Sequence, residues 1–425
     1  MSVGPDIAKL PHAGETAPLP PEAFNGDVIA WFEHLREAAP VSRDEKGTYL
    51  IARYDDVYEA LNDPETFSSH QQLEQAEFDK VNVRSIVYAD DPEHLDFRKL
   101  VNRAWTPGAV IEFRDAIARN VDELVGDLKD GEPFDVVRLG LQVSQRSFSE
   151  AMGLPNDQHE RIARWFQASG AFVRPDQIMR NMGRARPALE QRAALYESGF
   201  PDMAAYFYEI VEKYGDCDLA TLKESGVPPF PRALVAAHQA DPANIDLILT
   251  KVMPPLLAGG VSTLSHVFPN AVDVLLEHPD LWARLRADET LLALEGRSDV
   301  IEEILRLRAV VQGMPRVTTR DVEVSGTVIP KGSLVQLCYL SAGRDEAAFE
   351  QPDAFRDRGL SRHLTFGFGT HTCMGQSLVR LELKIFLRAL LKRFARLERV
   401  PAKADWGGVG VYYTPDTLPV VGFAA

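Results

Sequence analysis

The chain has 425 residues, of which 45% are apolar and 25% charged, a composition typical of folded globular proteins rather than disordered or collagen-like chains. Its 46 basic and 62 acidic residues give a formal net charge of −16, which argues against general binding of DNA or RNA. At roughly 150 residues per domain, the length predicts two or three domains. The 3 cysteines are too few for a disulfide scaffold and favour a reducing cytoplasm.

The N-terminal segment has neither the basic region nor the apolar core of a secretory signal, and we expect residues 1–20 to form a disordered or extended leader. The most apolar stretch, Ile245 to Phe268, is interrupted by Asp246, Lys251 and Pro254. A membrane-spanning helix needs about 20 mainly apolar residues, so this stretch is better interpreted as a buried core helix. We therefore expect a soluble protein without a membrane anchor.

Helices dominate the predicted elements of the first half of the chain. The β-branched and aromatic run over residues 48–54 predicts a strand. Helical spacing of apolar residues then marks, in chain order, residues 55–61, 92–128, 137–152 and 157–172. Asp241 and Pro242 form a helix start, as N-cap and first helical residue, and predict a long apolar helix that ends near Glu277.

The second half adds short strands to the predicted helices. A short helix over 299–308 begins with Asp299 and Glu302 in a capping-box-like arrangement. The period of apolar residues then changes to two, which predicts short strands between 317 and 337, and a last long helix covers 376–394. Because helices and strands do not alternate as βαβ units, the predicted fold class is mainly α with small β-sheets.

The sequence around the last cysteine, Phe-Gly-Phe-Gly-Thr-His-Thr-Cys-Met-Gly over residues 366–375, carries the clearest chemical signal. Its first two glycines permit a tight turn in which the backbone can approach a flat ligand closely. Cys373 stands just before a predicted helix, where the positive end of the helix dipole and free backbone N–H groups stabilise a thiolate. Taken alone, a buried structural cysteine in a glycine turn is the alternative interpretation.

This segment resembles the haem-binding loop of the cytochrome P450 family, Phe-Gly-x-Gly-x-His-x-Cys-x-Gly, at every fixed position, including Phe366, Gly367 and Gly375. The resemblance implies that Cys373 ligates the iron of haem b, as its sole protein ligand. It extends from about Pro20 to the end of the chain and is strongest to soluble bacterial members of the camphor-hydroxylase type. It implies one haem-thiolate domain over 21–425, with the haem buried between the long central helix and the cysteine loop.

Other matches to the family follow residue by residue. Glu303 and Arg306 match its Glu-x-x-Arg pair, which in isolation would be an i,i+3 surface ion pair. The resemblance implies a buried structural pair that supports the haem loop. It also implies that four cationic or imidazole side chains bind the haem carboxylates: His94, Arg98, Arg316 and His371. Such side chains suit this role because buried carboxylates need charged or hydrogen-bonding partners.

The long central helix carries Ala-Gly-Gly-Val-Ser-Thr over 258–263, which resembles the family's oxygen-activating sequence, (Ala/Gly)-Gly-x-(Asp/Glu)-Thr. The resemblance implies that Gly259 and Gly260 open the helix for oxygen and that the alcohol of Thr263 assists its protonation. The sequence departs from the family at Ser262, where an acid is usual. A serine hydroxyl can pass a proton along a chain but holds none to give at neutral pH.

The missing acid leaves three interpretations open. His266, one turn beyond Ser262, could replace the acid, although a core or surface histidine is the plainer account. The substrate could supply or organise the proton donor. The enzyme could instead depend more on peroxide than on O2 and two electrons.

Electrons have to come from another protein, because 3 cysteines, one of them assigned to haem, cannot hold a four-cysteine cluster. The family implies a ferredoxin or flavodoxin with its reductase. We expect an acidic donor to dock near Arg98, Lys99 and Arg103, although these residues could also form an ordinary solvated face.

The substrate pocket is weakly encoded. The resemblance places apolar candidates around it, although core packing explains any one of them equally well: Phe166, Phe172, Leu257, Val261, Val310 and Val311. They suggest a small apolar substrate, aromatic or terpenoid-like. We therefore expect a monooxygenase with an atypical proton relay. The alternatives are a peroxygenase or another haem-thiolate catalyst, and a haem-binding sensor.

Overall fold

The computed structural model describes most of the chain; the residues not described are 1–15, 18–26, 45–46, 71–84, 170–188, 360–361, 401–405, 407–411 and 425. Helices make up most of the described part, as the sequence predicts. They are α2 (Val28–Ala38), α3 (Tyr54–Asn62), α4 (Glu93–Val101), α5 (Pro107–Val110), α6 (Arg114–Gly126), α7 (Val136–Ala151), α8 (His159–Ser169), α10 (Leu189–Tyr214), α11 (Leu219–Glu224), α12 (Pro229–Ala240), α13 (Asn244–Leu247), α14 (Met253–Leu257), α15 (Leu264–Glu277), α16 (Pro279–Ala287), α17 (Asp299–Leu307), α18 (Tyr339–Ala342) and α19 (Gln376–Arg393).

The described strands form three small sheets. A six-stranded sheet has the order β1-β2-β3-β9-β6-β4, from β1 (Thr16–Ala17), β2 (Val41–Asp44), β3 (Tyr49–Ile51), β9 (Leu334–Leu337), β6 (Met314–Thr318) and β4 (Phe67–Ser68). A second sheet has the order β10-β11-β5, from β10 (Arg396–Arg399), β11 (Pro419–Phe423) and β5 (Pro133–Asp135), and the third is a hairpin of β7 (Val322–Val324) and β8 (Thr327–Ile329). The predicted class, mainly α with small sheets, is confirmed.

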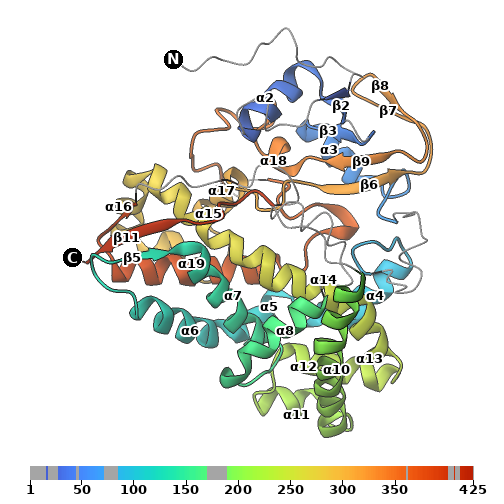
Figure 1. The fold of residues 1–425 in the computed structure, drawn as a ribbon, viewed down its shortest axis with the longest axis vertical. Helices are drawn as coiled ribbons and strands as arrows, with labels where there is room; N and C mark the ends of the chain where they lie inside the picture. The colour runs from blue at the N-terminus through green and yellow to red at the C-terminus, as the bar shows by residue number, and fades with distance from the viewer. Residues whose placement is uncertain are drawn as a thin grey trace.

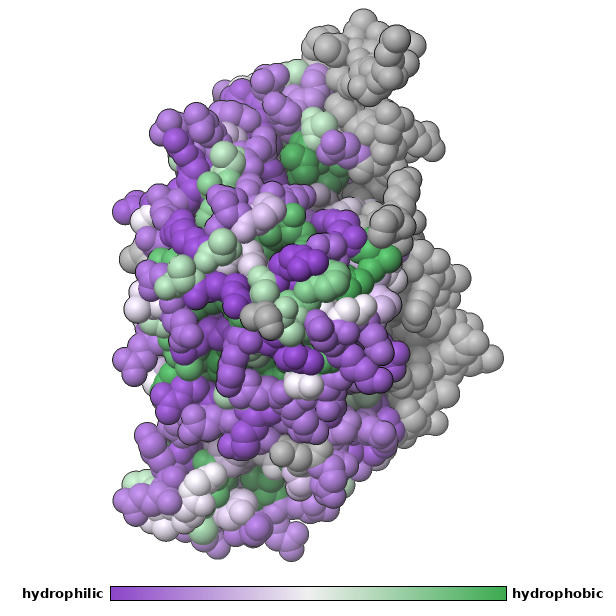
Figure 2. All heavy atoms as spheres, turned by 90° about the vertical axis from the view of Figure 1, so that its left-hand side faces the viewer, coloured by the Kyte–Doolittle hydropathy of each residue, from purple (hydrophilic) through white to green (hydrophobic). Residues whose placement is uncertain are grey.

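Figure 1 shows these elements in three regions. The six-stranded sheet lies at one end with α2, α3 and α18, and the helices α10, α11 and α12 lie at the other. Between them run α15 and α19, and α15 packs closely on α7. The largest cluster of buried apolar side chains spans this middle region and the helical end, so the central helix is surrounded by protein. Figure 2 shows one face of the molecule, where hydrophilic residues predominate, as expected when the apolar side chains form a buried core.

The long central helix is continuous from Asn244 to Glu277 but departs from α-helical pitch in two segments. Two π-helical segments, Ile248–Val252 and Ala258–Thr263, flank α14. Proline has no N–H, so Pro255 cannot donate to the carbonyl of Lys251 one turn earlier. That carbonyl accepts the amide of Ile86 instead, at 3.0 Å. The missing N–H of Pro255 thus leaves a helix carbonyl available to bond the segment around Ile86.

By length and composition, this helix is the one in the described part of the chain that could cross a membrane. That is weak evidence, because core helices pass the same test. Phe268, Ala271 and Val272 in its second half are fully buried, and we interpret it as a core helix.

Two helix starts differ from the sequence prediction. Asp241 ends α12, and the long helix begins at Asn244 with Ala243 as its N-cap residue. Ser298 caps α17, because its hydroxyl accepts the amide of Ile301. Asp299 is therefore the first helical residue, and the Glu302 side chain is free for another role.

Candidate active site

The cysteine loop is a compact turn between the segment at 363–366 and helix α19. Its backbone is closed by hydrogen bonds from Gly367 N to Leu364 O, at 2.8 Å, and from Cys373 N to Phe366 O, at 2.9 Å. Gly367 and Gly369 have φ of +66° and +70°, in the left-handed region that favours glycine. The two glycines therefore allow the turn that brings Cys373 to the start of α19.

The thiol of Cys373 lines a cavity inside the molecule. Burial raises its pKa, while the backbone N–H groups of Gly375 and Gln376 and the charges of Arg98 and Arg380 act in the opposite direction. These N–H groups belong to the free donors at the N-terminus of α19, as the sequence predicts. Burial is the larger effect, so the pKa of the Cys373 thiol is raised overall, and a bound cation would be needed to favour the thiolate.

Four predicted side chains meet at one side of the same cavity: His94, Arg98, Arg316 and His371. Arg98 donates to the carbonyl of Thr370 at 2.9 Å, and the rings of His94 and His371 lie against each other, tilted by 30°, with centroids 3.9 Å apart. Burial lowers the pKa of His94, and burial together with His94 and Arg316 lowers the pKa of His371 to about 3. Two arginines and two neutral imidazoles facing a cavity are suited to binding carboxylates.

Another part of the cavity wall comes from the central helix. Gly259, Gly260 and Thr263 line it, all within the second π-helical segment. A Cβ atom on Gly260 would collide with the ring of Phe148, which also lines the cavity, whereas a Cβ on Gly259 would meet no atom. The two glycines therefore have different functions: Gly260 lets Phe148 pack on the helix, and Gly259 leaves open space.

The structure places two of the predicted pocket residues outside the cavity wall. Leu257 and Val261 are fully buried in the apolar core and do not line the cavity. The helix lines the cavity with neighbouring pairs that recur every three to four residues along one face, followed by one more residue: Pro255 and Leu256, Gly259 and Gly260, Thr263 and Leu264, and Val267. Residues 257 and 261 fall on the neighbouring face.

The other predicted pocket residues divide between the cavity, the core and the undescribed segment. Val310 and Val311 do line the cavity, as predicted. Phe166 packs against the core and is not one of the cavity residues. Phe172 lies outside the described residues.

Glu303 and Arg306 form a fully buried bidentate ion pair, with both N···O distances 2.7 Å. A third residue, which the sequence analysis missed, completes the site: Arg358 Nε donates to Glu303 Oε1 at 2.8 Å. The amide of Arg356 donates to the same oxygen, at 3.2 Å. Glu303 thus fixes the segment that leads into the cysteine loop.

Glu302, its neighbour on α17, fixes the other side of the loop. Arg380 on α19 donates to it at 2.6 Å and 2.9 Å, and Arg297 and His363 also contact it, at 2.7 Å and 3.2 Å. The guanidinium of Arg380 also lies 4.6 Å from the ring centroid of Phe366. The sequence predicts Glu302 in a helix cap and gives no sign of this cluster.

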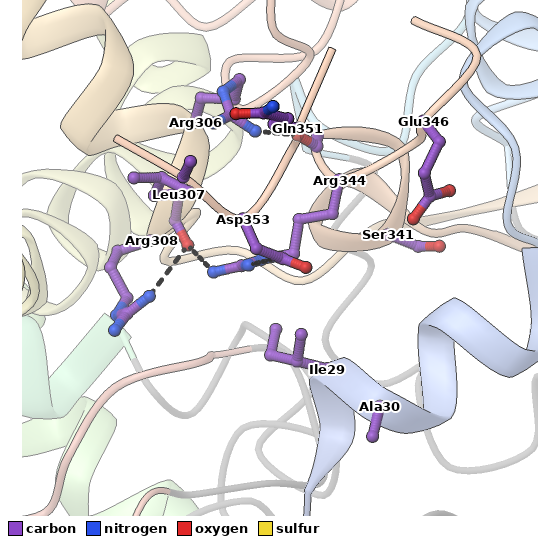
Figure 3. A network of polar contacts seen from close by, with 12 residues as sticks. Ile29, Ala30, Arg306, Leu307, Arg308, Ser341, Arg344, Glu346, Gln351 and Asp353 are labelled. Atoms are coloured by element: carbon purple, nitrogen blue, oxygen red, sulfur yellow. Dashed lines mark hydrogen bonds and ion pairs between the residues drawn. The ribbon is translucent and has the colours of Figure 1, made fainter. Parts of the chain in front are cut away.

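Figure 3 shows how the C-terminal end of α17 is held. The carbonyl of Leu307 accepts N–H groups from Arg344, at 2.9 Å, and Arg308, at 3.5 Å, and Arg344 also pairs with Asp353. Arg308 in turn bonds Asp273 on the central helix, at 3.0 Å. These contacts attach α17, which carries both glutamates, to the central helix that lines the cavity.

Thr263 has a partner that the sequence analysis missed. Its hydroxyl lies 3.1 Å from the hydroxyl of Tyr412, and either atom could donate the hydrogen bond. Ser262 is not among the cavity residues, and its carbonyl accepts the hydroxyl of Ser265 at 2.7 Å. The position where the family has an acid is therefore turned away from the cavity wall.

The comparisons with known proteins agree with this geometry. The cytochrome P450 family model matches residues 40–405. CYP199A2 of Rhodopseudomonas palustris is 30% identical over 92% of this chain and 90% of its own, and the erythromycin C-12 hydroxylase of Saccharopolyspora erythraea is 32% identical over 89% and 90%. Among solved structures, the crystal structure of CYP109E1 from Bacillus megaterium in complex with corticosterone matches this fold with a TM-score of 0.75. The two sequences are 26% identical, and the match covers 93% of this chain and 98% of the CYP109E1 chain.

This chain belongs to the cytochrome P450 family. It is an oxidoreductase enzyme, since its relatives are named as oxygenases and hydroxylases, and the family's cofactor is haem.

Proposed function

We propose that this protein is a haem-thiolate monooxygenase that inserts one oxygen atom of O2 into a small apolar substrate. The observation that supports it is the cavity itself, which is lined both by Cys373 of the cysteine loop and by Thr263 of the central helix. Haem b, when bound, activates oxygen with a thiolate ligand that favours O–O cleavage. We also propose that residues 21–425 act as one catalytic domain, in the cytoplasm.

The residues present suit this cofactor. Cys373 would ligate the iron, and the N–H groups of Gly375 and Gln376 would stabilise its sulfur as an anion. Arg98 and Arg316 would pair with the two haem carboxylates, and His94 and His371 would add hydrogen bonds. Phe366 and Gly367 line the cavity beside the cysteine and leave room for a flat ring system.

The substrate class follows from the rest of the cavity wall. Trp105, Phe148, Leu256, Val310 and Val311 make it largely apolar and partly aromatic. An apolar wall favours substrates that bind through buried area rather than charge. An aromatic or terpenoid-like molecule suits this wall.

The electron donor would be a ferredoxin or flavodoxin. Arg98 points inward to Thr370, so of the predicted docking residues only Lys99 and Arg103 remain on the surface of this segment. Lys99 is paired with Asp96 at 2.9 Å, an exposed ion pair that contributes little and can be exchanged for a partner's carboxylate. On a chain of net charge −16, these local cations would direct an acidic donor to this face.

One spectrum tests the cofactor assignment. The purified protein, reduced and exposed to carbon monoxide, should give the Soret maximum characteristic of thiolate ligation. Cys373→Ala and Cys373→His should lose that maximum, while Cys338→Ala, at a buried cysteine away from the cavity, should keep it. A wild-type spectrum without the thiolate signature would contradict the proposal. A screen for substrate-induced spin shifts then identifies the ligand class.

Peroxygenase activity is the second candidate, favoured by Ser262. Because no carboxylate stands there, proton delivery for O2 chemistry has to come from elsewhere, whereas peroxide brings its own protons. Turnover with hydrogen peroxide should be slower than with reduced ferredoxin and O2 if the monooxygenase proposal is correct. The reverse order would establish the peroxygenase.

A further inference from the structure

Thr263 contacts both the cavity and a tyrosine that lies behind the cavity wall. Thr263 lines the cavity, and its hydroxyl is hydrogen-bonded to the phenol of Tyr412, which does not line it. The tyrosine is buried, with 9% of its surface exposed. A proton that reaches the cavity through Thr263 would therefore come by way of this phenol.

The backbone around Tyr412 is fixed by contacts with the strand-like segment after α17. Tyr412 forms a β-bridge with Val311, its carbonyl accepts the side-chain amide of Gln312 at 3.2 Å, and the amide of Tyr413 donates to Val310 O at 2.7 Å. Val310 and Val311 themselves line the cavity. The phenol is thus held in register with the cavity wall rather than carried on a free loop.

Behind the phenol lies an imidazole. His266, one turn beyond Thr263 on the same helix, packs its ring against that of Tyr412 with centroids 5.2 Å apart. Its Nδ1 is buried and has no hydrogen-bond partner among the described residues. Burial lowers the pKa of His266 to about 4, so the ring is neutral at pH 7 and can pass a proton only by accepting on one nitrogen and releasing from the other.

We propose that Tyr412, with His266 behind it, replaces the missing acid and hands protons to Thr263. A proton enters the His266 ring at one nitrogen while the other nitrogen releases one to Tyr412 Oη through one bridging water. The phenol proton passes to Thr263 Oγ1, and the alcohol proton enters the cavity. One proton enters and one leaves for each passage, so every group returns to its neutral form. The inference rests on the proposed oxygen chemistry.

The first test measures how the electrons divide between product and released hydrogen peroxide. Tyr412→Phe keeps the ring and removes the hydroxyl. Expected is about a tenfold fall in the ratio of product to released hydrogen peroxide with reduced ferredoxin and O2. Product formation driven by added hydrogen peroxide should change by less than about twofold, because the reagent supplies the protons. A merely structural role would lower both rates alike.

Two further variants define the path. Tyr413→Phe alters the neighbouring tyrosine, whose ring stacks on Trp406 at 4.7 Å, and should leave the product-to-peroxide ratio unchanged. His266→Phe keeps an aromatic ring against Tyr412 and should lower the ratio in the same direction as Tyr412→Phe. An unchanged ratio in Tyr412→Phe, or equal losses with O2 and with peroxide, overturns the proposal. An unchanged ratio in His266→Phe overturns the assignment of the histidine.

The second test needs no turnover. In a double-mutant cycle with Thr263→Val and Tyr412→Phe, the urea midpoint of the double variant should fall by less than the sum of the two single losses. Additive losses would show that the hydroxyls do not interact and would overturn the proposal. This measurement also separates failure of the relay from failure of the proposed function. If the cycle is non-additive but the wild-type protein forms no product with O2, the monooxygenase function itself is contradicted.

Discussion

Arg380 Nε lies 2.6 Å from Glu302 Oε1, which joins the helix that follows the cysteine to the helix that carries the Glu303–Arg306 pair. Glu302 is fully buried, and Arg380 is nearly so. Removing one partner of a buried ion pair leaves an uncompensated charge, which costs far more than loss of an exposed pair. The contact is therefore structurally important in a way that surface ion pairs are not.

Arg380→Gln should lower the free energy of unfolding by about 3 kcal/mol, because Glu302 then keeps only Arg297 and His363 as charged or polar partners. Arg388→Gln on the same helix is the matched control, since its pair with Glu289 is exposed and should contribute at most about 1 kcal/mol. Urea unfolding of both variants measures the difference. Equal losses would show that the buried contact has no special weight.

The same cluster should make stability depend on acid. Burial alone would raise the pKa of Glu302, but hydrogen bonds from Arg380 and His363 outweigh it and hold that pKa well below the usual range. A depressed pKa stabilises the fold above the unfolded value of about 4.3, and this stability is lost as pH falls towards the folded value. The urea midpoint should decline between about pH 4.5 and about pH 3, less steeply in Arg380→Gln. Parallel declines would assign the acid sensitivity to other carboxylates.

The adjacent glycines of the central helix should respond oppositely to alanine. Gly260→Ala places a methyl group into the ring of Phe148 and should cost about 1–3 kcal/mol through overpacking. Gly259→Ala meets open space and should be neutral or stabilising by up to about 1 kcal/mol, because alanine favours helix. Urea unfolding measures both. A similar loss in both variants would mean that the helix backbone, and not Phe148, sets the requirement.

Haem retention tests the cationic side of the cavity. Arg316→Gln should increase the rate of haem loss to an acceptor protein by about tenfold or more, since a charge-assisted contact contributes about 1.5–3 kcal/mol. Arg320→Gln, a few residues further on the chain and 67% exposed, is the control and should behave as wild type. The Soret absorbance followed over time measures the rate. Identical rates in the two variants would remove Arg316 from the haem contacts.

Cys217 and Cys338 should differ in reactivity. Burial raises the pKa of the Cys338 thiol to about 12, so this cysteine should resist alkylation at pH 8 in the native protein. Cys217 is half-buried and should react faster than Cys338. Peptide mass spectrometry after iodoacetamide treatment, with and without denaturant, distinguishes the two. Native labelling of Cys338 at the rate of Cys217 would contradict its burial.

The parts of the fold that the sequence predicts correctly are those with local causes. The helix at Gln376–Arg393 follows from an apolar stripe, and the short strands after Met314 follow from alternation and glycine turns. The cap of α17 was placed one residue late, at Asp299 rather than Ser298, because both residue types can cap a helix. Local signals thus identify the elements better than their ends.

The site residues that were missed depend on distant contacts. Arg358 reaches Glu303 across 55 residues, and Tyr412 reaches Thr263 across 149. Helical spacing shows that Leu257 and Val261 share a face, but not whether that face is turned to the cavity or to the core. Glu302 and Glu303 look alike in the sequence, and only the fold shows that they bind different arginines.

Those consecutive glutamates have a mechanical consequence. Glu303 holds the chain before the cysteine, through Arg356 and Arg358, and Glu302 holds the chain after it, through Arg380. Both ends of the loop are therefore held by adjacent residues of one helix. A displacement of α17 would carry the sulfur with it as a rigid unit, so the distance from the thiol to the central helix is set by how α17 sits against that helix, not by the loop's own flexibility.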